Sequence, residues 1–228
     1  MNRLTWHGHS CFTLATSSGH LLLFDPWLDD NPTADIKTNQ ITRLDFVLCS
    51  HGHSDHFADA IKLCKKTSAT LLGTYELVAF AQSKGVKSGH GMSIGGGYTF
   101  PFGYAKMTPA MHGGQVAGDD DGAYTTQPAG WWLDLNGARL YHAGDTALIM
   151  DMQLLQGRVD VALLPIGDNY TMGPDDAVRA VEMIRPKTVI PMHYNTFDVI
   201  KQDPHDFARK VGNTAKVTIL TPGESIDF

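Results

Sequence analysis

The chain has 228 residues, of which 43% are hydrophobic, and its formal net charge is −6 at neutral pH. This length suffices for a full hydrophobic core, and no apolar stretch approaches the roughly 20 residues of a transmembrane helix. Lysine and arginine are scattered rather than gathered in a stripe, which disfavours nucleic acid as a partner without excluding a small phosphodiester. No linker or low-complexity segment divides the sequence, so we expect residues 1–228 to form a single domain.

The first half is predicted to contain three strands, a helix, a further strand and a second helix. They cover Leu4–Ala15, His20–Phe24, Phe46–Cys49, Asp59–Lys66, Thr70–Leu72 and Glu76–Lys84. The cluster Ser17-Ser18-Gly19 predicts a hairpin turn between the first two strands. Because Phe46–Cys49 is short and apolar throughout, it is typical of a strand that is covered on both faces.

The segment HGHSDH directly follows that apolar strand and contains three histidines and an aspartate. Imidazole nitrogens and carboxylate oxygens are the ligands that hold Zn²⁺ and similar divalent ions. In an extended segment His51 and His53 share a face, whereas Asp55 and His56 come one turn later. This spacing predicts a two-metal centre, with about 3.5–4 Å between the ions. The alternative, a histidine-rich turn in which Asp55 caps the following helix, explains one residue and none of the histidines.

The second half follows a similar plan of strands and helices. Strands are predicted at Tyr104–Ala110, Gly130–Leu135, Ala138–His142, Asp160–Pro165 and Thr188–Met192, with a helix from Pro174 to about Ile184 and a short helix and strand at the end. Asn136-Gly137 is typical of a type I′ hairpin turn. Pro174 is suited to the first helical position, with acidic residues behind it. Two mixed sheets packed face to face with helices outside, an αββα sandwich with the metals at one edge, account for this order.

The pattern HxHxDH after an apolar strand resembles the signature of the metallo-β-lactamase superfamily. That superfamily has a third histidine, then an aspartate that bridges both metals, then a last histidine, each at a strand end. Here His112 follows YAKMTPAM, Asp145 lies in YHAGDT and His193 closes TVIPMHY. The resemblance covers nearly the whole chain and implies an α/β fold of four layers, αββα, with two mixed sheets flanked by helices.

The resemblance also implies which residues would bind each metal ion. His51, His53 and His112 would bind the first ion. The second would be bound by Asp55, His56 and His193, with Asp145 between the two ions.

Three further segments narrow the resemblance within the superfamily. They are Trp6–Phe12 (WHGHSCF), Phe24–Leu28 (FDPWL) and Gly167–Ala177 (GDNYTMGPDDA). They are similar to a bacterial family of metal-dependent hydrolases of about this length. That family is related more distantly to L-ascorbate-6-phosphate lactonase, and its physiological substrates are largely unassigned.

Residues beside the motif have competing interpretations. His7 and His9 flank Gly8, and we interpret His7 as a surface residue, whereas His9 either supports a ligand or faces the substrate. Asp25 follows the apolar LLLF and would either start a turn or accept a hydrogen bond from a metal-binding histidine. We predict the second role, because metal-bound histidines usually donate their other N–H group to a carboxylate or a carbonyl.

Two loops are candidates for contact with the substrate. The stretch Gly113–Pro128 begins directly after His112, and is either a plain exposed loop or a lid over the site. Asn169 and Tyr170 precede a helix start, where we expect substrate contact. A phosphate pocket there is disfavoured, because Asp175 and Asp176 already occupy the positive end of that helix.

We therefore expect a metal-dependent hydrolase that uses a dinuclear centre and metal-bound hydroxide on a small ester, lactone or phosphodiester. Asp55 or Asp145 would orient the hydroxide and return a proton to the leaving group. The alternative is a non-catalytic metal-binding or sensing protein of the same fold. Zn²⁺ is the first expectation for both ions, with Mn²⁺, Fe²⁺ or Ni²⁺ as alternatives. The expected partner is a small molecule, with no membrane and no nucleic acid, and the sequence leaves a homo-oligomer open.

The cysteines and the N-terminus bear on the cellular compartment. The chain has an odd number of cysteines, and none of them shows CxxC spacing. We therefore expect Cys11, Cys49 and Cys64 to be reduced thiols in the core. The N-terminal segment MNRLTWHGHS has no apolar region typical of a signal peptide. Both features favour the cytoplasm.

Overall fold

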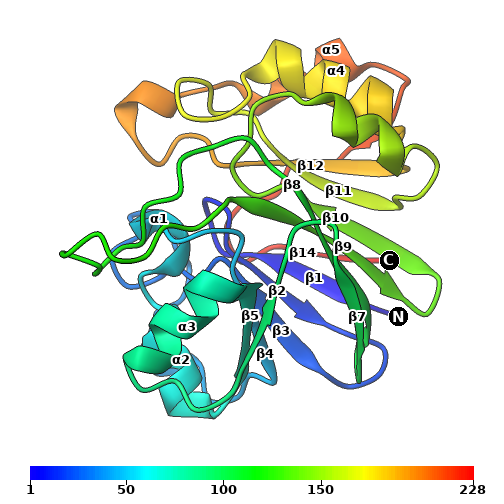
Figure 1. Cartoon of the computed structure of the whole chain (residues 1–228). Helices are drawn as coiled ribbons and strands as arrows, with labels where there is room; N and C mark the ends of the chain where they lie inside the picture. The colour runs from blue at the N-terminus through cyan, green and yellow to red at the C-terminus, as the bar shows by residue number, and fades with distance from the viewer.

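A computed structural model describes residues 1–228, and its strands form two seven-stranded sheets that pack face to face (Figure 1). In spatial order, the first sheet contains β14 (Ser225–Asp227), β1 (Arg3–Trp6), β2 (Phe12–Ala15), β3 (Leu21–Phe24), β4 (Phe46–Leu48), β5 (Thr70–Thr74) and β6 (Gly89–Met92). The second contains β13 (Lys216–Val217), β12 (Thr188–Met192), β11 (Val161–Pro165), β10 (Ala138–His142), β9 (Ala129–Leu135), β8 (Gly103–Pro109) and β7 (Gly97–Phe100). Each sheet has both parallel and antiparallel pairs.

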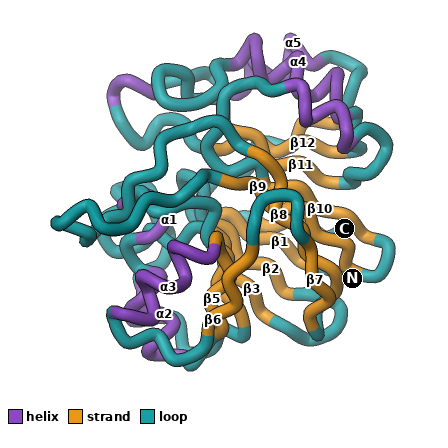
Figure 2. The backbone as a smooth tube through the Cα atoms, viewed as in Figure 1, coloured by secondary structure: helices purple, strands orange, loops and turns teal.

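The helices cover the two outer faces of this sandwich, as Figure 2 shows. On the first sheet lie α1 (Ser54–Phe57), α2 (Ala60–Thr67) and α3 (Tyr75–Ser83). On the second sheet lie α4 (Pro174–Ile184) and α5 (Pro204–Val211). Short 3₁₀ helices are η1 (Thr38–Gln40), η2 (Met150–Leu155) and η3 (Asp198–Ile200). The predicted four-layer αββα architecture is therefore confirmed.

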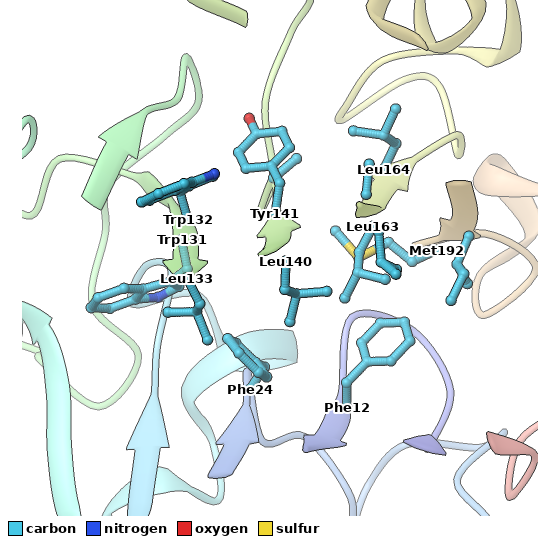
Figure 3. Close-up of a cluster of buried hydrophobic side chains, with 14 of the residues drawn as sticks. Phe12, Phe24, Trp131, Trp132, Leu133, Leu140, Tyr141, Leu163, Leu164 and Met192 are labelled. Atoms are coloured by element: carbon cyan, nitrogen blue, oxygen red, sulfur yellow. The ribbon is translucent and has the colours of Figure 1, made fainter. Parts of the chain in front are cut away.

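Strand β3 illustrates why an uninterrupted apolar sequence is needed here. Successive side chains of a strand point to opposite faces, and both faces of this strand are covered. Leu22 and Phe24 join the core between the sheets, whereas Leu23 joins the core under α2 and α3. Figure 3 shows the core between the sheets, where Phe24 of one sheet faces Leu140 of the other.

Parallel pairing brings the ends of several strands to one edge of the sandwich. In the first sheet β3, β4 and β5 are parallel neighbours, and in the second β10, β11 and β12 are. Parallel strands end at the same edge, where α/β folds bind their ligands. Asp25 follows β3, His51 follows β4, Asp145 follows β10 and His193 follows β12. The order of strands thus gathers residues that are distant in sequence.

Most predicted elements are present, with some differences near the N-terminus. The predicted strand Leu4–Ala15 is wrong, because the chain reverses between β1 and β2. Gly8 and His9 both have positive φ angles, of 91° and 54°, and the Cys11 amide donates to the Gly8 carbonyl. The strands β6 and β7 were not predicted, because glycines weaken the usual strand signal.

The turn and helix signals give a mixed result. Asn136 and Gly137 have φ angles of 58° and 99°, as a type I′ turn requires, and α4 begins at Pro174 as predicted.

The capping interpretation of Asp55 is wrong. Asp55 lies in the first turn of α1, which ends at Phe57, and the longer helix α2 starts separately at Ala60.

Two further observations concern the whole chain. None of its helices combines the length and the apolarity that a membrane crossing requires. All three cysteines are buried and unpaired, as the sequence predicted.

Leu163 of β11 lies fully buried in the core between the sheets (Figure 3). Replacing it with alanine leaves a cavity, so we expect Leu163→Ala to lower the free energy of unfolding by about 2–5 kcal/mol. Denaturation with urea would measure this change. The control is Leu154→Ala, because Leu154 is 74% exposed and its truncation should cost no more than about 0.5 kcal/mol. Equal losses in the two variants would contradict this description of the core.

Candidate metal centre

Three groups of histidine and aspartate side chains meet at the shared edge of the two sheets. Within each group one ligand atom per residue lies within 4.8 Å of the others. The first group is His51, His53 and His112; the second is His9, Asp55, His56 and His193; the third is His51, His56 and Asp145. All seven residues implied by the superfamily resemblance are therefore brought together, and His9 joins them.

Asp145 lies between the histidines of the first two groups. Its Oδ2 atom is 3.0 Å from Nε2 of His193 and 3.3 Å from Nε2 of His56. The same oxygen is 3.5 Å from Nε2 of His112, which belongs to the other group. A single buried carboxylate oxygen thus approaches both groups at once.

Several of these atoms are buried without a hydrogen-bond partner. They are Nε2 of His51, His56 and His193, and Oδ1 of Asp145. A buried polar atom left unsatisfied costs about 1–3 kcal/mol, and native proteins contain few of them. These four atoms, all nitrogen or oxygen, belong to residues of two overlapping groups, and together they fit a site for divalent cations.

The residues around Asp145 carry the charges of the site, whereas His51, His53 and His112 are neutral. Burial acts to raise the pKa of the Asp145 carboxyl, but His193 and His56 outweigh it and hold that pKa well below its usual range. Burial acts to lower the pKa of both histidines. The Asp145 carboxylate nevertheless raises the pKa of His193 to about 9, and that of His56 also rises. A divalent cation bound here would displace these protons.

The other group consists of neutral imidazoles. Burial lowers the pKa of His51 well below its ordinary value, and neighbouring histidines add to the effect. Burial likewise lowers the pKa of His53 and His112. Neutral imidazole has a free lone pair, which is the form that binds a metal ion.

Asp25 orients the histidines from behind. It is fully buried, and its Oδ2 atom accepts a hydrogen bond of 2.8 Å from Nδ1 of His56. The same carboxylate accepts the amide (2.7 Å) and the hydroxyl (2.6 Å) of Ser50. The Ser50 oxygen lies 2.9 Å from Nδ1 of His51 and accepts its proton, so both histidines present Nε2 to the site. Ser50 was missed in the sequence, although it immediately precedes the motif.

His9 holds Asp55 in a similar way. The His9 ring is buried, and its Nε2 atom donates to Oδ2 of Asp55 over 3.1 Å. Its Nδ1 atom accepts from the hydroxyl of Thr196 at 2.9 Å, a residue that the sequence did not indicate. Burial, with a contribution from His193, lowers the pKa of His9 to about 4, so the ring is neutral. Because both ring nitrogens are engaged, His9 positions Asp55.

The interpretation of His7 as a surface residue is wrong. Its ring is buried between Asp35 and Thr13, at 2.8 Å from Nδ1 and 2.7 Å from Nε2. Asp35 lies 28 positions away, and Thr13 comes near only because the chain reverses between β1 and β2, so the local sequence could not reveal these contacts. His7 belongs to the support of the N-terminal strands and lines no part of the metal centre.

Three residues of the site have strained backbones. His9, Asp25 and His193 have φ angles of 54°, 41° and 55°, in a region that residues other than glycine seldom adopt. Such conformations cost about 1–3 kcal/mol each and persist where the surroundings enforce them, most often at functional sites. Asp25 and His193 directly follow β3 and β12, and His9 lies in the connection between β1 and β2, so these conformations place all three side chains in the cluster.

A cavity of about 420 Å³ opens over these side chains. Tyr170 and Phe197 line it together with His53, Ser54, Asp55, His112, Asp145 and His193. Asn169, expected to contact the substrate, is not among the lining residues, and Phe197 was missed in the sequence. A more enclosed cavity of about 250 Å³ lies beside Trp132 and contains none of the candidate ligands. The chemistry therefore points to the larger, open cavity.

The segment Gly113–Pro128 packs against the histidine motif. Val116 is 1% exposed, and the amide of Ala117 donates to the carbonyl of Gly52 over 2.7 Å. A side chain at Gly52 would overlap the backbone of Val116. The alternative of a plain exposed loop is therefore wrong for this part of the segment, and its action as a lid stays a prediction.

Comparisons with known proteins agree with the fold and the site. The family model described as "Beta-lactamase superfamily domain" matches residues 3–193. A UPF0173 metal-dependent hydrolase from Bacillus cereus strain Q1 is 47% identical over 229 residues, covering 98% of this chain and 99% of that protein. One from Enterococcus faecalis is 44% identical, with 98% of each chain covered. The structure of Igni18, a metallo hydrolase from Ignicoccus hospitalis, has a TM-score of 0.87 at 34% identity and covers 100% of both chains.

The chain therefore belongs to the metallo-β-lactamase superfamily. Within it, the chain belongs to the UPF0173 metal-dependent hydrolases, which makes it a hydrolase that depends on metal ions. The more distant relation to L-ascorbate-6-phosphate lactonase stays a prediction.

The hydrogen bond from His56 to Asp25 can be tested by Asp25→Asn. The amide nitrogen of asparagine cannot accept from Nδ1 of His56, so the ring loses its orientation. We expect metal affinity or activity to fall by about 10–100-fold, while the circular dichroism spectrum stays unchanged. Metal titration of the purified variant would measure this. Asp35→Asn, beside His7, is the matched control and should retain affinity. Unchanged affinity in Asp25→Asn would show that this contact does not support the centre.

Proposed function

We propose that this protein hydrolyses a small molecule at a centre of two divalent metal ions. The observation that carries the proposal is the position of Asp145, whose Oδ2 atom lies 3.0 Å from His193 and 3.5 Å from His112. A carboxylate in that position offsets the repulsion between two cations a few ångströms apart. One ion would have no need of ligands on both sides of Asp145.

The proposed ligands of the two ions come from the first two groups described above, together with Asp145. His51, His53 and His112 would hold the first ion. Asp55, His56 and His193 would hold the second, and Asp145 would lie between the two. These nitrogen and oxygen donors suit Zn²⁺ first, and also Mn²⁺, Fe²⁺ or Ni²⁺.

When bound, the two ions supply a water of lowered pKa and polarise the oxygen of the scissile bond. Asp55 is the side chain best placed to move the proton, because its carboxylate lines the cavity and is 20% exposed, against 2% for Asp145. His9 fixes Asp55 through the hydrogen bond to Oδ2. Asp55 then accepts a proton from the attacking water and returns it to the leaving group.

Two further features belong to the proposal. Because both sheets supply ligands, residues 1–228 act as a single catalytic domain. Three buried free thiols support a reducing compartment, the cytoplasm. The substrate is a small ester, lactone or phosphodiester, and the scattered positive charge disfavours nucleic acid as a partner.

Asp145→Ala tests the two-metal arrangement. The variant should lose the second ion and most hydrolytic activity, whereas the first ion, with three histidines of its own, should largely remain. The metal content, measured by elemental analysis, should fall from two ions per chain to one. Turnover should be measured on a panel of esters, lactones and phosphodiesters.

Two controls accompany this test. Asp176→Ala removes an exposed carboxylate on α4 and should keep both ions and full turnover. The wild-type protein treated with a chelator should lose activity and regain it when metal is returned. A variant of Asp145 with two ions and normal turnover would refute the bridging role. Wild-type protein that binds both ions and hydrolyses nothing would favour the metal-sensing alternative.

A further inference from the structure

Apart from the histidines of the centre itself, the walls of the cavity over the metal centre contain no side chain that can carry a positive charge. None of its lining residues is lysine or arginine. A second cavity, of about 460 Å³, opens on the other side of His112, and it also lacks both. Glu76 lines that second cavity, so the only full charges on the combined walls outside the candidate ligands are negative.

The nearest lysine in the sequence to this wall is already paired. Lys201 lies four residues beyond Phe197, and its ammonium group is 2.7 Å from the carboxylate of Asp198. A second anionic group on the substrate, away from the metals, would meet no lysine or arginine on these walls. Such a group would lose water on entering the site and gain nothing in return, which makes its binding unfavourable.

One wall of the cavity is instead aromatic. The ring of Phe197 stacks on Trp27, with centroids 5.6 Å apart and planes inclined by 27°. It also meets the edge of His9 at 5.7 Å. Phe197 is nevertheless 37% exposed, because one side of the ring faces the cavity. This support fixes the ring before a ligand arrives.

Tyr170 supplies a second aromatic surface. It is 55% exposed and follows Asp168 and Asn169, whose φ angles of 64° and 52° form a tight turn. Figure 1 shows the segments that carry Tyr170 (yellow) and Phe197 (orange) at the same end of the molecule as α1. Two exposed rings at the mouth of a polar site offer contact area to an apolar group.

We propose that the substrate is an uncharged carboxylic ester or lactone with an apolar or aromatic substituent, which packs against Phe197 and Tyr170. This inference rests on the hydrolase function proposed above. The reaction breaks the bond between the acyl carbon and the ester oxygen. The oxygen of water bonds to the acyl carbon, the alcohol leaves with one proton of water, and the second proton is released as the acid ionises.

The charge of the product fits this choice of substrate. A neutral ester becomes a carboxylate at the moment of hydrolysis. Beyond the metal ions themselves, the walls offer no lysine or arginine that would add to the retention of that carboxylate. The lack of lysine and arginine on the walls thus favours both a neutral substrate and release of the product.

A matched pair of esters tests the inference with the metal-loaded full-length protein. 4-Nitrophenyl hexanoate and mono-4-nitrophenyl adipate differ only in a terminal methyl or carboxylate group. We expect kcat/KM to be about 10–100-fold higher for the hexanoate, because the adipate brings an unpaired charge into the site. Bis(4-nitrophenyl) phosphate, tested alongside, should be the poorer substrate as well.

Variants of the aromatic wall sharpen the test. Phe197→Arg supplies the missing cation and should raise kcat/KM for the adipate while lowering it for the hexanoate. Tyr170→Arg, at a more exposed position, should shift the preference in the same direction. Tyr98→Arg adds the same charge on the distant strand β7, where the tyrosine is 51% exposed, and should change neither value. Metal content is measured for each protein, so that loss of the centre is not taken for a change in preference.

The outcomes separate this inference from the proposed function. If the wild-type protein hydrolyses the adipate or the phosphodiester at least as well as the hexanoate, the neutral-substrate inference is overturned and the hydrolase function stands. If protein with two bound ions hydrolyses none of these compounds or of the wider ester, lactone and phosphodiester panel, both are overturned.

Discussion

The structure depends on one constraint, the burial of the Asp145 carboxylate among histidines at the meeting point of two sheets. A buried anion is costly unless cations surround it. His193 and His56 on one side and His112 on the other lie within 3.5 Å of one of its oxygens. Each of these residues comes from a different part of the chain, so the charge balance of the centre and the packing of the two sheets are coupled.

The fold meets this constraint by placing rigid elements behind each ligand. Asp25 and Ser50 fix the tautomers of His56 and His51, and His9 fixes Asp55. The strained backbones at Asp25 and His193 directly follow β3 and β12, and the one at His9 lies in the connection between β1 and β2. Ligands carried on strand ends and supported by a second layer of hydrogen bonds keep their geometry better than ligands on free loops. The centre is therefore fixed before a metal ion or a substrate binds.

The walls above the centre, unlike the ligands, are not built from strand ends. They come from connecting segments, the one after β11 with Tyr170 and the one after β12 with Phe197. Such segments vary more readily than the strands that carry them, so the chemistry is common to the superfamily while the choice of substrate belongs to each member. The absence of lysine and arginine from these walls is thus more informative about the substrate than the metal ligands are.

The sequence by itself determined the histidine cluster HGHSDH after a buried strand, because its spacing is local. The resemblance of that pattern to the superfamily signature then implied the fold class and added His112, Asp145 and His193, which follow in the expected chain order. The tertiary structure alone decided the partners of His7 and His9, the roles of Ser50 and Thr196, and the aromatic wall at Phe197. The physical reason is sequence distance, because His9 and Thr196 are 187 positions apart and no local pattern encodes such a contact. The same holds for β6 and β7, whose glycines form strands only because neighbouring strands supply the pairing.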